Sequence, residues 1–165
     1  MILIDWDDTL LCSSFLSQSA HCLSTPLYDL SRPLEATDSA EVREAHEVAM
    51  QLRDLEACVC AVLKQAIAAA NRVVIVTNAE HGWCQLSAAK FLPSVVPLLD
   101  HLHVVSARSA FEHVFPDSPL RWKYSAMSEI LHGSGFFGRD GRVHVDKHVI
   151  SCQCCSVARA SLHAG

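Results

Sequence analysis

Apolar residues along the chain form two kinds of pattern, short continuous runs and longer segments with helical spacing. Continuous runs are typical of strands that are buried on both faces. Spacing of three and four residues is typical of amphipathic helices. Strands that alternate with helices indicate an α/β fold, so we predict a Rossmann-like parallel sheet with helices on both faces. The predicted strands are 1–5, 73–78, 102–107 and 142–151, and the predicted helices are a short one inside 10–36 and longer ones at about 39–70, 82–92 and 120–131.

The longest predicted helix begins near Ser39 and ends near Ala70. Asp38 and Glu41 resemble a capping box at its start, an arrangement in which side chains accept hydrogen bonds from the first N–H groups of a helix. The helix lies within the stretch 10–70, which contains no other long periodic segment. The stretch is therefore a candidate small helical insert.

Composition and charge indicate a globular domain and limit its expected partners. Half of the 165 residues are hydrophobic and 19% are charged, as in ordinary globular domains. We therefore predict one domain over 1–165, with an irregular tail at 152–165. The formal net charge of −5 argues against nucleic acid or an anionic membrane surface as a partner.

Neither a membrane span nor a signal peptide is visible in the sequence. No apolar run reaches the roughly 20 residues that cross a bilayer. No basic segment precedes Asp5, as a signal peptide would require. The eight cysteines are then expected to be reduced thiols of a cytoplasmic protein, rather than a disulfide framework.

The first apolar run ends in a dense group of carboxylates, in the stretch "DWDDTL". Asp5 and Asp7 are two positions apart, so their side chains point the same way in an extended chain. Two close carboxylates repel each other and favour a cation, and Mg²⁺ suits them because it keeps sites for water and phosphate. One carboxylate could then attack phosphorus while the other transfers protons. The alternative is a strand-end turn followed by the acidic first turn of a helix.

Three segments resemble motifs of the haloacid dehalogenase (HAD) superfamily, in the order of that family. "IDWDDTLL" is similar to its first motif, an apolar strand followed by Asp, any residue, Asp, any residue and Thr. Asp8 stands where many members have Gly. "VVIVTN" resembles the second motif, an apolar strand that ends in Thr or Ser, here Thr77. Lys123, in "PLRWKYSAM", has the place of the third-motif Lys near the start of a helix.

The resemblance covers most of the chain and implies both a fold and a reaction. It implies a HAD-like core, with at most a minimal cap because only residues 78–122 separate the second motif from the third. It also implies a Mg²⁺-dependent phosphatase that forms an aspartyl-phosphate. An Asp at the position of Asp7 is typical of phosphoryl-transfer members, whereas true dehalogenases generally lack it. The phosphorylated substrate would reach an open site, which suits a macromolecule such as a phosphoprotein.

The resemblance also implies a role for each matched residue. Asp5 would be the nucleophile, and Asp7 would protonate the leaving group and later activate water. Thr77, Asn78 and Lys123 would bind phosphate, and Lys123 would also offset the charge on Asp5. Mg²⁺ would be held by Asp5 and by the backbone carbonyl of Asp7. Three tryptophans lie near these motifs, where they either line the crevice or pack in the core, the commoner role of aromatic residues; they are Trp6, Trp83 and Trp122.

The fourth motif departs from the family pattern. Gln153 and Cys154 stand where Gly and the metal-binding Asp would follow the last strand, and no Asp or Glu follows Asp146. The loss of an acidic ligand weakens metal binding. The alternative function is therefore a catalytically impaired, HAD-like binding or regulatory protein that lacks a complete metal site.

A zinc site near the C-terminus is a further alternative. The candidate ligands do not match a standard zinc spacing, and His144 and His148 would lie ~13 Å apart on one strand face. The ligand set would be His144, His148, Cys152, Cys154 and Cys155.

Overall fold

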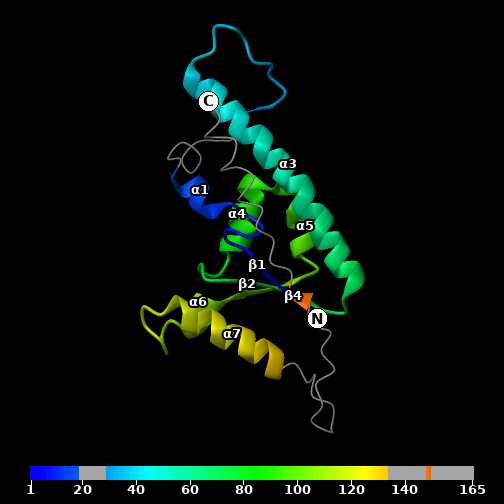
Figure 1. The fold of residues 1–165 in the computed structure, drawn as a ribbon, viewed down its shortest axis with the longest axis vertical. Helices are drawn as coiled ribbons and strands as arrows, with labels where there is room; N and C mark the ends of the chain where they lie inside the picture. The colour runs from blue at the N-terminus through cyan, green and yellow to red at the C-terminus, as the bar shows by residue number, and fades with distance from the viewer. Residues whose placement is uncertain (19–28, 134–147, 150–165) are drawn as a thin grey trace.

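The computed structural model describes residues 1–18, 29–133 and 148–149 of the chain (Figure 1). Helices and strands follow one another largely as the hydrophobic pattern predicts. In chain order the elements are β1 (Ile2–Asp5), α1 (Ser13–Gln18), α3 (Ala40–Ala69), β2 (Val73–Thr77), α4 (Trp83–Phe91), the 3-10 helix η1 (Pro93–Val95), α5 (Val96–Leu99), β3 (His103–Ser106), α6 (Ala107–Phe111), α7 (Pro119–Gly133) and β4 (His148–Val149).

The strands form one parallel sheet in the order β3-β2-β1-β4. In its register Asp5 lies opposite Val76 and Thr77 lies opposite Ser106. The carboxyl ends of β1, β2 and β3 therefore meet at one edge of the sheet, where open α/β sheets bind their ligands. The parallel α/β architecture predicted from the sequence is confirmed.

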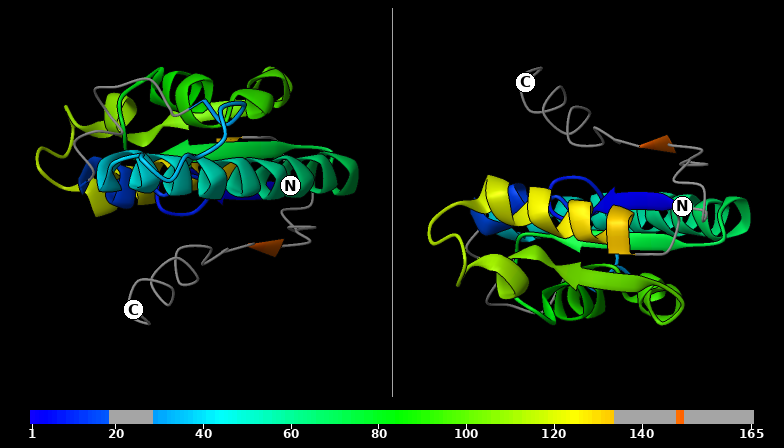
Figure 2. Two further views of the ribbon diagram at one scale, coloured as in Figure 1. Left: turned by 90° about the horizontal axis from the view of Figure 1, so that it is seen from above. Right: turned by 90° about the horizontal axis from the view of Figure 1, so that it is seen from below.

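Alternate residues of the central strand β2 enter two separate hydrophobic cores. Val73 and Ile75 belong to the core shared with α1, α3, α4 and α5, whereas Val74 and Val76 belong to the core shared with α6 and α7. All five residues of β2 are buried, because a strand covered on both faces has no solvent side. Figure 1 shows the same division, with α6 and α7 below the sheet and α4 and α5 above it, and in Figure 2 α3 lies in front of the sheet from above and α7 lies in front of it from below. Helices cover both faces, which is compatible with a Rossmann-like fold.

The long helix α3 begins where the sequence predicts, but its cap is different. Ser39 is the N-cap residue, and its Oγ accepts a hydrogen bond from Val42 N at 3.3 Å. The Asp38 carboxylate instead accepts hydrogen bonds from Glu35 N and from the Arg32 guanidinium. The predicted capping box on Asp38 is therefore wrong, because its carboxylate stabilises the preceding turn.

Short helices fill the connections that the sequence pattern leaves unassigned. η1 and α5 follow Pro93, and α6 follows β3 directly. Ser106 begins α6 by accepting a hydrogen bond from Ser109 N at 3.0 Å. These helices have three to five residues, too few for a helical period to be recognised.

The C-terminal prediction is only partly within the described residues. Of the strand predicted at 142–151, His148 and Val149 form β4 and pair with Ile2 and Leu3 of β1. The predicted tail at 152–165 lies outside the described residues. In the ranges that the structure describes, no helix is both long enough and apolar enough to cross a membrane.

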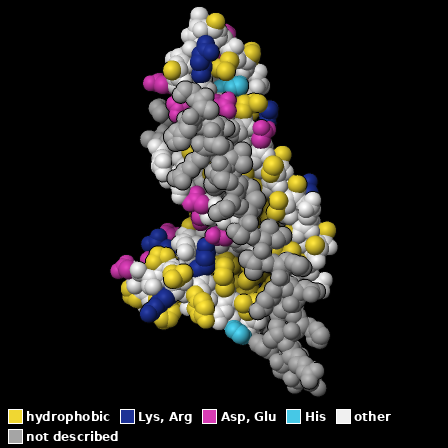
Figure 3. Space-filling model, in the orientation of Figure 1, with side chains coloured by type: hydrophobic (Ala, Val, Ile, Leu, Met, Phe, Trp, Pro, Cys, Tyr) yellow, Lys and Arg dark blue, Asp and Glu magenta, His cyan; other side chains and the backbone are white. Residues whose placement is uncertain are grey.

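Hydrophobic side chains also gather on the outside of α6 and α7, at the lower left of the space-filling view (Figure 3). Leu120 and Tyr124 are four residues apart on α7 and are 83% and 75% exposed. The opposite face of α7 carries Trp122, Ala126 and Ile130, which are buried against the sheet. This buried face fixes how α7 lies on the sheet and hence where its polar side chains point.

Candidate functional site

Asp5 and Lys123 form an ion pair at the carboxyl edge of the sheet. Lys123 Nζ donates to Asp5 Oδ2 at 2.6 Å, and both side chains are about three-quarters buried. Asp5 is the last residue of β1, and Lys123 lies in the first turns of α7, 118 residues away in the sequence. The structure therefore brings together Asp5 and Lys123, the two residues that the sequence motifs single out as a candidate nucleophile and a candidate phosphate-binding lysine.

The second oxygen of Asp5 is left without a partner among the described residues. Asp5 Oδ1 is buried and accepts no hydrogen bond. A buried, unpaired carboxylate oxygen is costly, and a bound cation would remove that cost. Asp5 therefore fits a Mg²⁺ ligand, although in the described part of the chain no three His, Cys, Asp or Glu side chains gather around one point. Mg²⁺ tolerates such a small set because it keeps several waters.

Asp7 is held by three hydrogen-bond donors from three parts of the chain. Thr77 Oγ1 donates to its Oδ2 at 2.6 Å, whereas Ser13 Oγ and Trp83 Nε1 donate to its Oδ1 at 2.6 and 2.9 Å. The carboxylate orientation is therefore fixed by α1, β2 and α4. Sequence reasoning missed Ser13, since a serine six residues after Asp7 matches no motif, and it favoured packing as the role of Trp83.

The Thr77 hydroxyl makes hydrogen bonds both to Asp7 and within its own loop. Its hydroxyl donates to Asp7, and the same oxygen accepts a hydrogen bond from Ala79 N at 2.9 Å. A contact between this hydroxyl and a phosphate group would therefore require the hydroxyl to change partner. Asn78, the next residue, has a buried Oδ1 with no hydrogen-bond partner in the described residues.

A tight turn after β1 positions the carboxylates. The backbone carbonyl of Trp6 accepts hydrogen bonds from the N–H groups of Thr9, Leu10 and Leu11. Asp8 has a φ of 55°, a left-handed conformation that Gly adopts freely and Asp adopts more readily than most residues. The left-handed φ explains why this position suits Asp, as it would suit the Gly found in many of the motifs that this segment resembles.

The side chain of Asp8 contributes to the same turn. Asp8 Oδ1 accepts a hydrogen bond from Ser14 N at 2.8 Å, and Oδ2 accepts one from Ser14 Oγ. The carboxylate thus binds N–H and hydroxyl groups at the beginning of α1. Asp7 thus binds Thr77 at the carboxyl edge of the sheet, whereas Asp8 holds the beginning of α1, the helix that carries Ser13.

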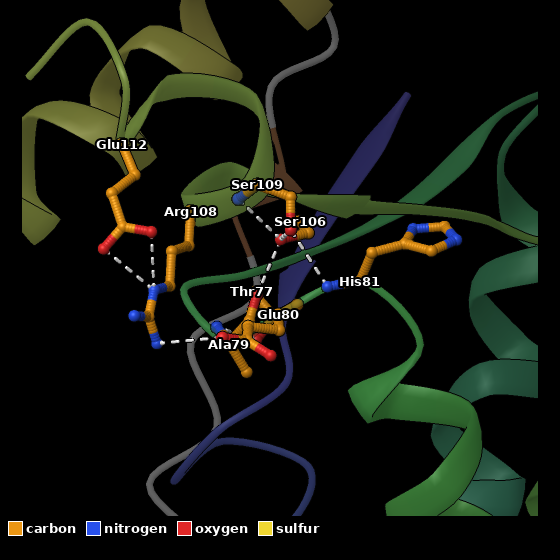
Figure 4. Close-up of polar contacts among 8 residues, drawn as sticks. All are labelled: Thr77, Ala79, Glu80, His81, Ser106, Arg108, Ser109 and Glu112. Carbon is orange, nitrogen blue, oxygen red and sulfur yellow. Dashed lines mark hydrogen bonds and ion pairs between the residues drawn. The ribbon is translucent and has the colours of Figure 1, made fainter.

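A second polar network anchors the loop between β2 and α4 (Figure 4). Ser106 Oγ donates to the carbonyl of Ala79 at 2.6 Å, and Ser109 Oγ accepts from His81 N at 3.0 Å. Arg108 lies 3.7 Å from Glu80 and 3.0 Å from Glu112. Because this loop leads directly into α4, the network also determines where the Trp83 indole meets Asp7.

A cavity of about 400 Å³ opens beside Asp7, between α1 and α4. Asn78, Ala79 and Trp83 line one part of it. Asp5 and Lys123 do not line it. The site therefore has two parts, the ion pair of Asp5 with Lys123 and a cavity that Asp7 lines.

Cys84 is a buried thiol close to these carboxylates. Burial raises the pKa of the Cys84 thiol to about 12, and the negative charges of Asp7 and Asp5 add to the shift. The thiol is therefore protonated at neutral pH. A protonated thiol is a poor nucleophile.

We expect Cys84 to resist alkylation in the folded protein. Iodoacetamide at pH 8 should modify the exposed Cys58 and leave Cys84 unmodified until urea unfolds the chain. Peptide mass spectrometry after quenching measures both sites in one sample. Equal modification of Cys58 and Cys84 without denaturant would contradict the burial described for Cys84.

Several predicted site residues lie outside the described residues. Gln153 and Cys154 of the fourth-motif segment are among them, as are His144, Cys152 and Cys155 of the zinc alternative. Of that ligand set, His148 has only its backbone described, in β4. The zinc hypothesis and the effect of the altered fourth motif stay predictions.

Comparisons with known proteins leave the family open. No family model, no curated protein and no solved structure matches this chain.

Proposed function

We propose that this protein is a Mg²⁺-dependent phosphomonoester hydrolase that acts through an aspartyl-phosphate on Asp5. The observation that carries the proposal is the state of the Asp5 carboxylate. One oxygen is paired with Lys123 at 2.6 Å, and the other is buried without a partner at the carboxyl edge of a parallel sheet. A nucleophilic carboxylate that binds a cation and a phosphate needs both features.

The reaction divides between Asp5 and Asp7. An Asp5 oxygen forms a bond to phosphorus as the bond between phosphorus and the leaving alcohol breaks, and Asp7 gives that alcohol a proton. Asp7 then takes a proton from a water molecule that attacks phosphorus, which releases phosphate and restores Asp5. Lys123 offsets negative charge throughout. Mg²⁺ on Asp5 and the backbone carbonyl of Asp7 would supply further charge neutralisation for the phosphate.

The donors around Asp7 determine which of its oxygens can carry the transferred proton. The indole N–H of Trp83 can only donate, so Asp7 Oδ1 is kept as an acceptor. The Thr77 hydroxyl can turn and accept instead, so a proton on Asp7 Oδ2 keeps its hydrogen bond. Asp7 Oδ2 is therefore the oxygen that can hold a proton between the two steps without losing a hydrogen bond.

The second candidate function is a HAD-like binding or regulatory protein with an incomplete metal site. Two observations favour it. No third acidic side chain joins Asp5 and Asp7 within the described ranges, and Gln153 and Cys154 replace the usual fourth-motif pair. Such a protein would bind a phosphorylated partner through Lys123 and would not hydrolyse it.

A metal-dependence assay with chemical trapping separates these two functions. We expect the purified chain to hydrolyse p-nitrophenyl phosphate with Mg²⁺ and to lose this activity with a chelator. Acid quenching during turnover should give a peptide that carries one phosphate on Asp5. Tight binding of a phosphopeptide, with no phosphate on Asp5 and no release of phosphate, would reject the hydrolase in favour of the binding protein.

A further inference from the structure

The cavity beside Asp7 has an apolar floor and a polar rim. Leu11, Leu16 and Phe91 form the floor and are at most 3% exposed. Ser14 and Ser17 of α1 lie at the exposed rim. Its volume of about 400 Å³ is at the lower end of the range for small-molecule sites and leaves room for one or two aromatic rings.

The charged residues among the described lining of the cavity are both acidic. Asp7 and Asp8 both line it, and among its described lining residues there is no Lys, Arg or His. Lys123, the cation of the site, is paired with Asp5 and does not line the cavity. The cavity therefore repels a ligand that carries a carboxylate or a second phosphate, and it accepts an uncharged group.

We infer that this cavity binds the leaving alcohol of the substrate, and that the alcohol is an uncharged aromatic one. The inference rests on the proposed function, in which Asp7 protonates the leaving oxygen from the cavity wall. The apolar floor buries the ring, and Trp83 offers an indole beside it. The substrate class is then a phosphomonoester of a small phenol-type alcohol. Phosphomonoesters whose alcohol carries a second anion are excluded.

The indole N–H of Trp83 allows this inference to be tested without catalysis. The three tryptophans have different partners, which gives three distinguishable indole signals in a ¹⁵N-labelled sample. Trp83 bonds to Asp7 at the cavity, Trp6 to Ser87 in the core and Trp122 to the carbonyl of Phe115 on the other side of the sheet. Trp83→Phe assigns the signal, and the other two signals serve as internal controls.

Two alcohols of similar size but different charge are the probes. We expect 2-naphthol to shift the Trp83 signal alone, and 6-hydroxy-2-naphthoate to bind at least about tenfold more weakly. Asp8→Asn keeps the left-handed turn, so it should reduce this discrimination by roughly three- to tenfold. Asp54→Asn, an exposed change on α3, should leave the discrimination unchanged. No Trp83 shift with 2-naphthol, or equal binding of the two alcohols, would overturn the inference.

Hydrolysis of the matching phosphomonoesters separates this inference from the proposed function. We expect kcat/KM for 2-naphthyl phosphate to exceed that for its 6-carboxylate by about tenfold or more. Binding of 2-naphthol at Trp83 without any hydrolysis would support the ligand class and reject the hydrolase. Hydrolysis of both esters at equal rates would support the hydrolase and overturn the assignment of the cavity.

Discussion

Asp5→Asn should abolish phosphatase activity, with kcat/KM for p-nitrophenyl phosphate falling on the order of 10⁴-fold or more. An amide oxygen is a poor nucleophile and a weaker Mg²⁺ ligand than a carboxylate, so the substitution would remove both of the roles proposed for Asp5. The amide has the shape of the carboxylate and can still accept a hydrogen bond from Lys123, so the fold is retained. Initial rates at saturating Mg²⁺ measure the loss.

A matched substitution gives the control for this loss. Asp54→Asn makes the same chemical change at an exposed position of α3, and it should leave kcat/KM within about twofold of the wild-type value. Intact mass spectrometry of Asp5→Asn excludes deamidation back to the carboxylate. Wild-type activity in verified Asp5→Asn protein would reject Asp5 as the nucleophile.

The largest stability effect is expected at Trp6, which joins the site to the core. Its side chain is fully buried, and its indole N–H donates to Ser87 Oγ at 3.0 Å. We expect Trp6→Ala to lower the free energy of unfolding by about 3–5 kcal/mol, because it opens a cavity and leaves Ser87 without its indole donor. A loss of this size is a large fraction of the stability of a small domain. Urea denaturation followed by circular dichroism measures it.

Two further variants show how much of the stability loss in Trp6→Ala comes from the ring and how much from its hydrogen bond. Trp6→Phe keeps most of the ring and removes the N–H donor, so the loss should be about 1–2 kcal/mol. Leu86→Ala changes a side chain of α4 that is 71% exposed, and the free energy of unfolding should change by less than about 0.5 kcal/mol. A Trp6→Ala protein as stable as Leu86→Ala would contradict the packing described around β1.

Trp6 also matters for the geometry of the site. Its carbonyl closes the turn that carries Asp7 and Asp8, and its ring contributes to the core beneath that turn. The ring is thus tied to α4 through Ser87, whose hydroxyl donates to the carbonyl of Trp83 at 2.7 Å. The same turn and the same helix therefore determine both the packing and the donors that orient Asp7.

The hydrophobic pattern predicted the strands and long helices because burial on one or both faces leaves a period in the sequence. The run from Val73 to Thr77 is apolar throughout, and it is the strand buried on both faces. The hydrophobic period does not locate the exact ends of helices, and it does not reveal helices of only a few residues. Ser39 caps α3 in place of Asp38 because the nearby Arg32 and Glu35 bind the Asp38 carboxylate.

The sequence by itself determined the order of the elements and the edge of the sheet where Asp5 and Thr77 lie, since parallel strands place their carboxyl ends at one edge. The pairing of Asp5 with Lys123 was expected only from the resemblance of the motifs, because Lys123 lies on a helix and not at a strand end. Only the tertiary structure decided which donors hold Asp7. Ser13 and Trp83 come from helices that pack on the same face of the sheet, and no local period records that contact. The cavity beside Asp7 exists for the same reason, because its shape depends on how α1 and α4 pack against each other rather than on either helix alone.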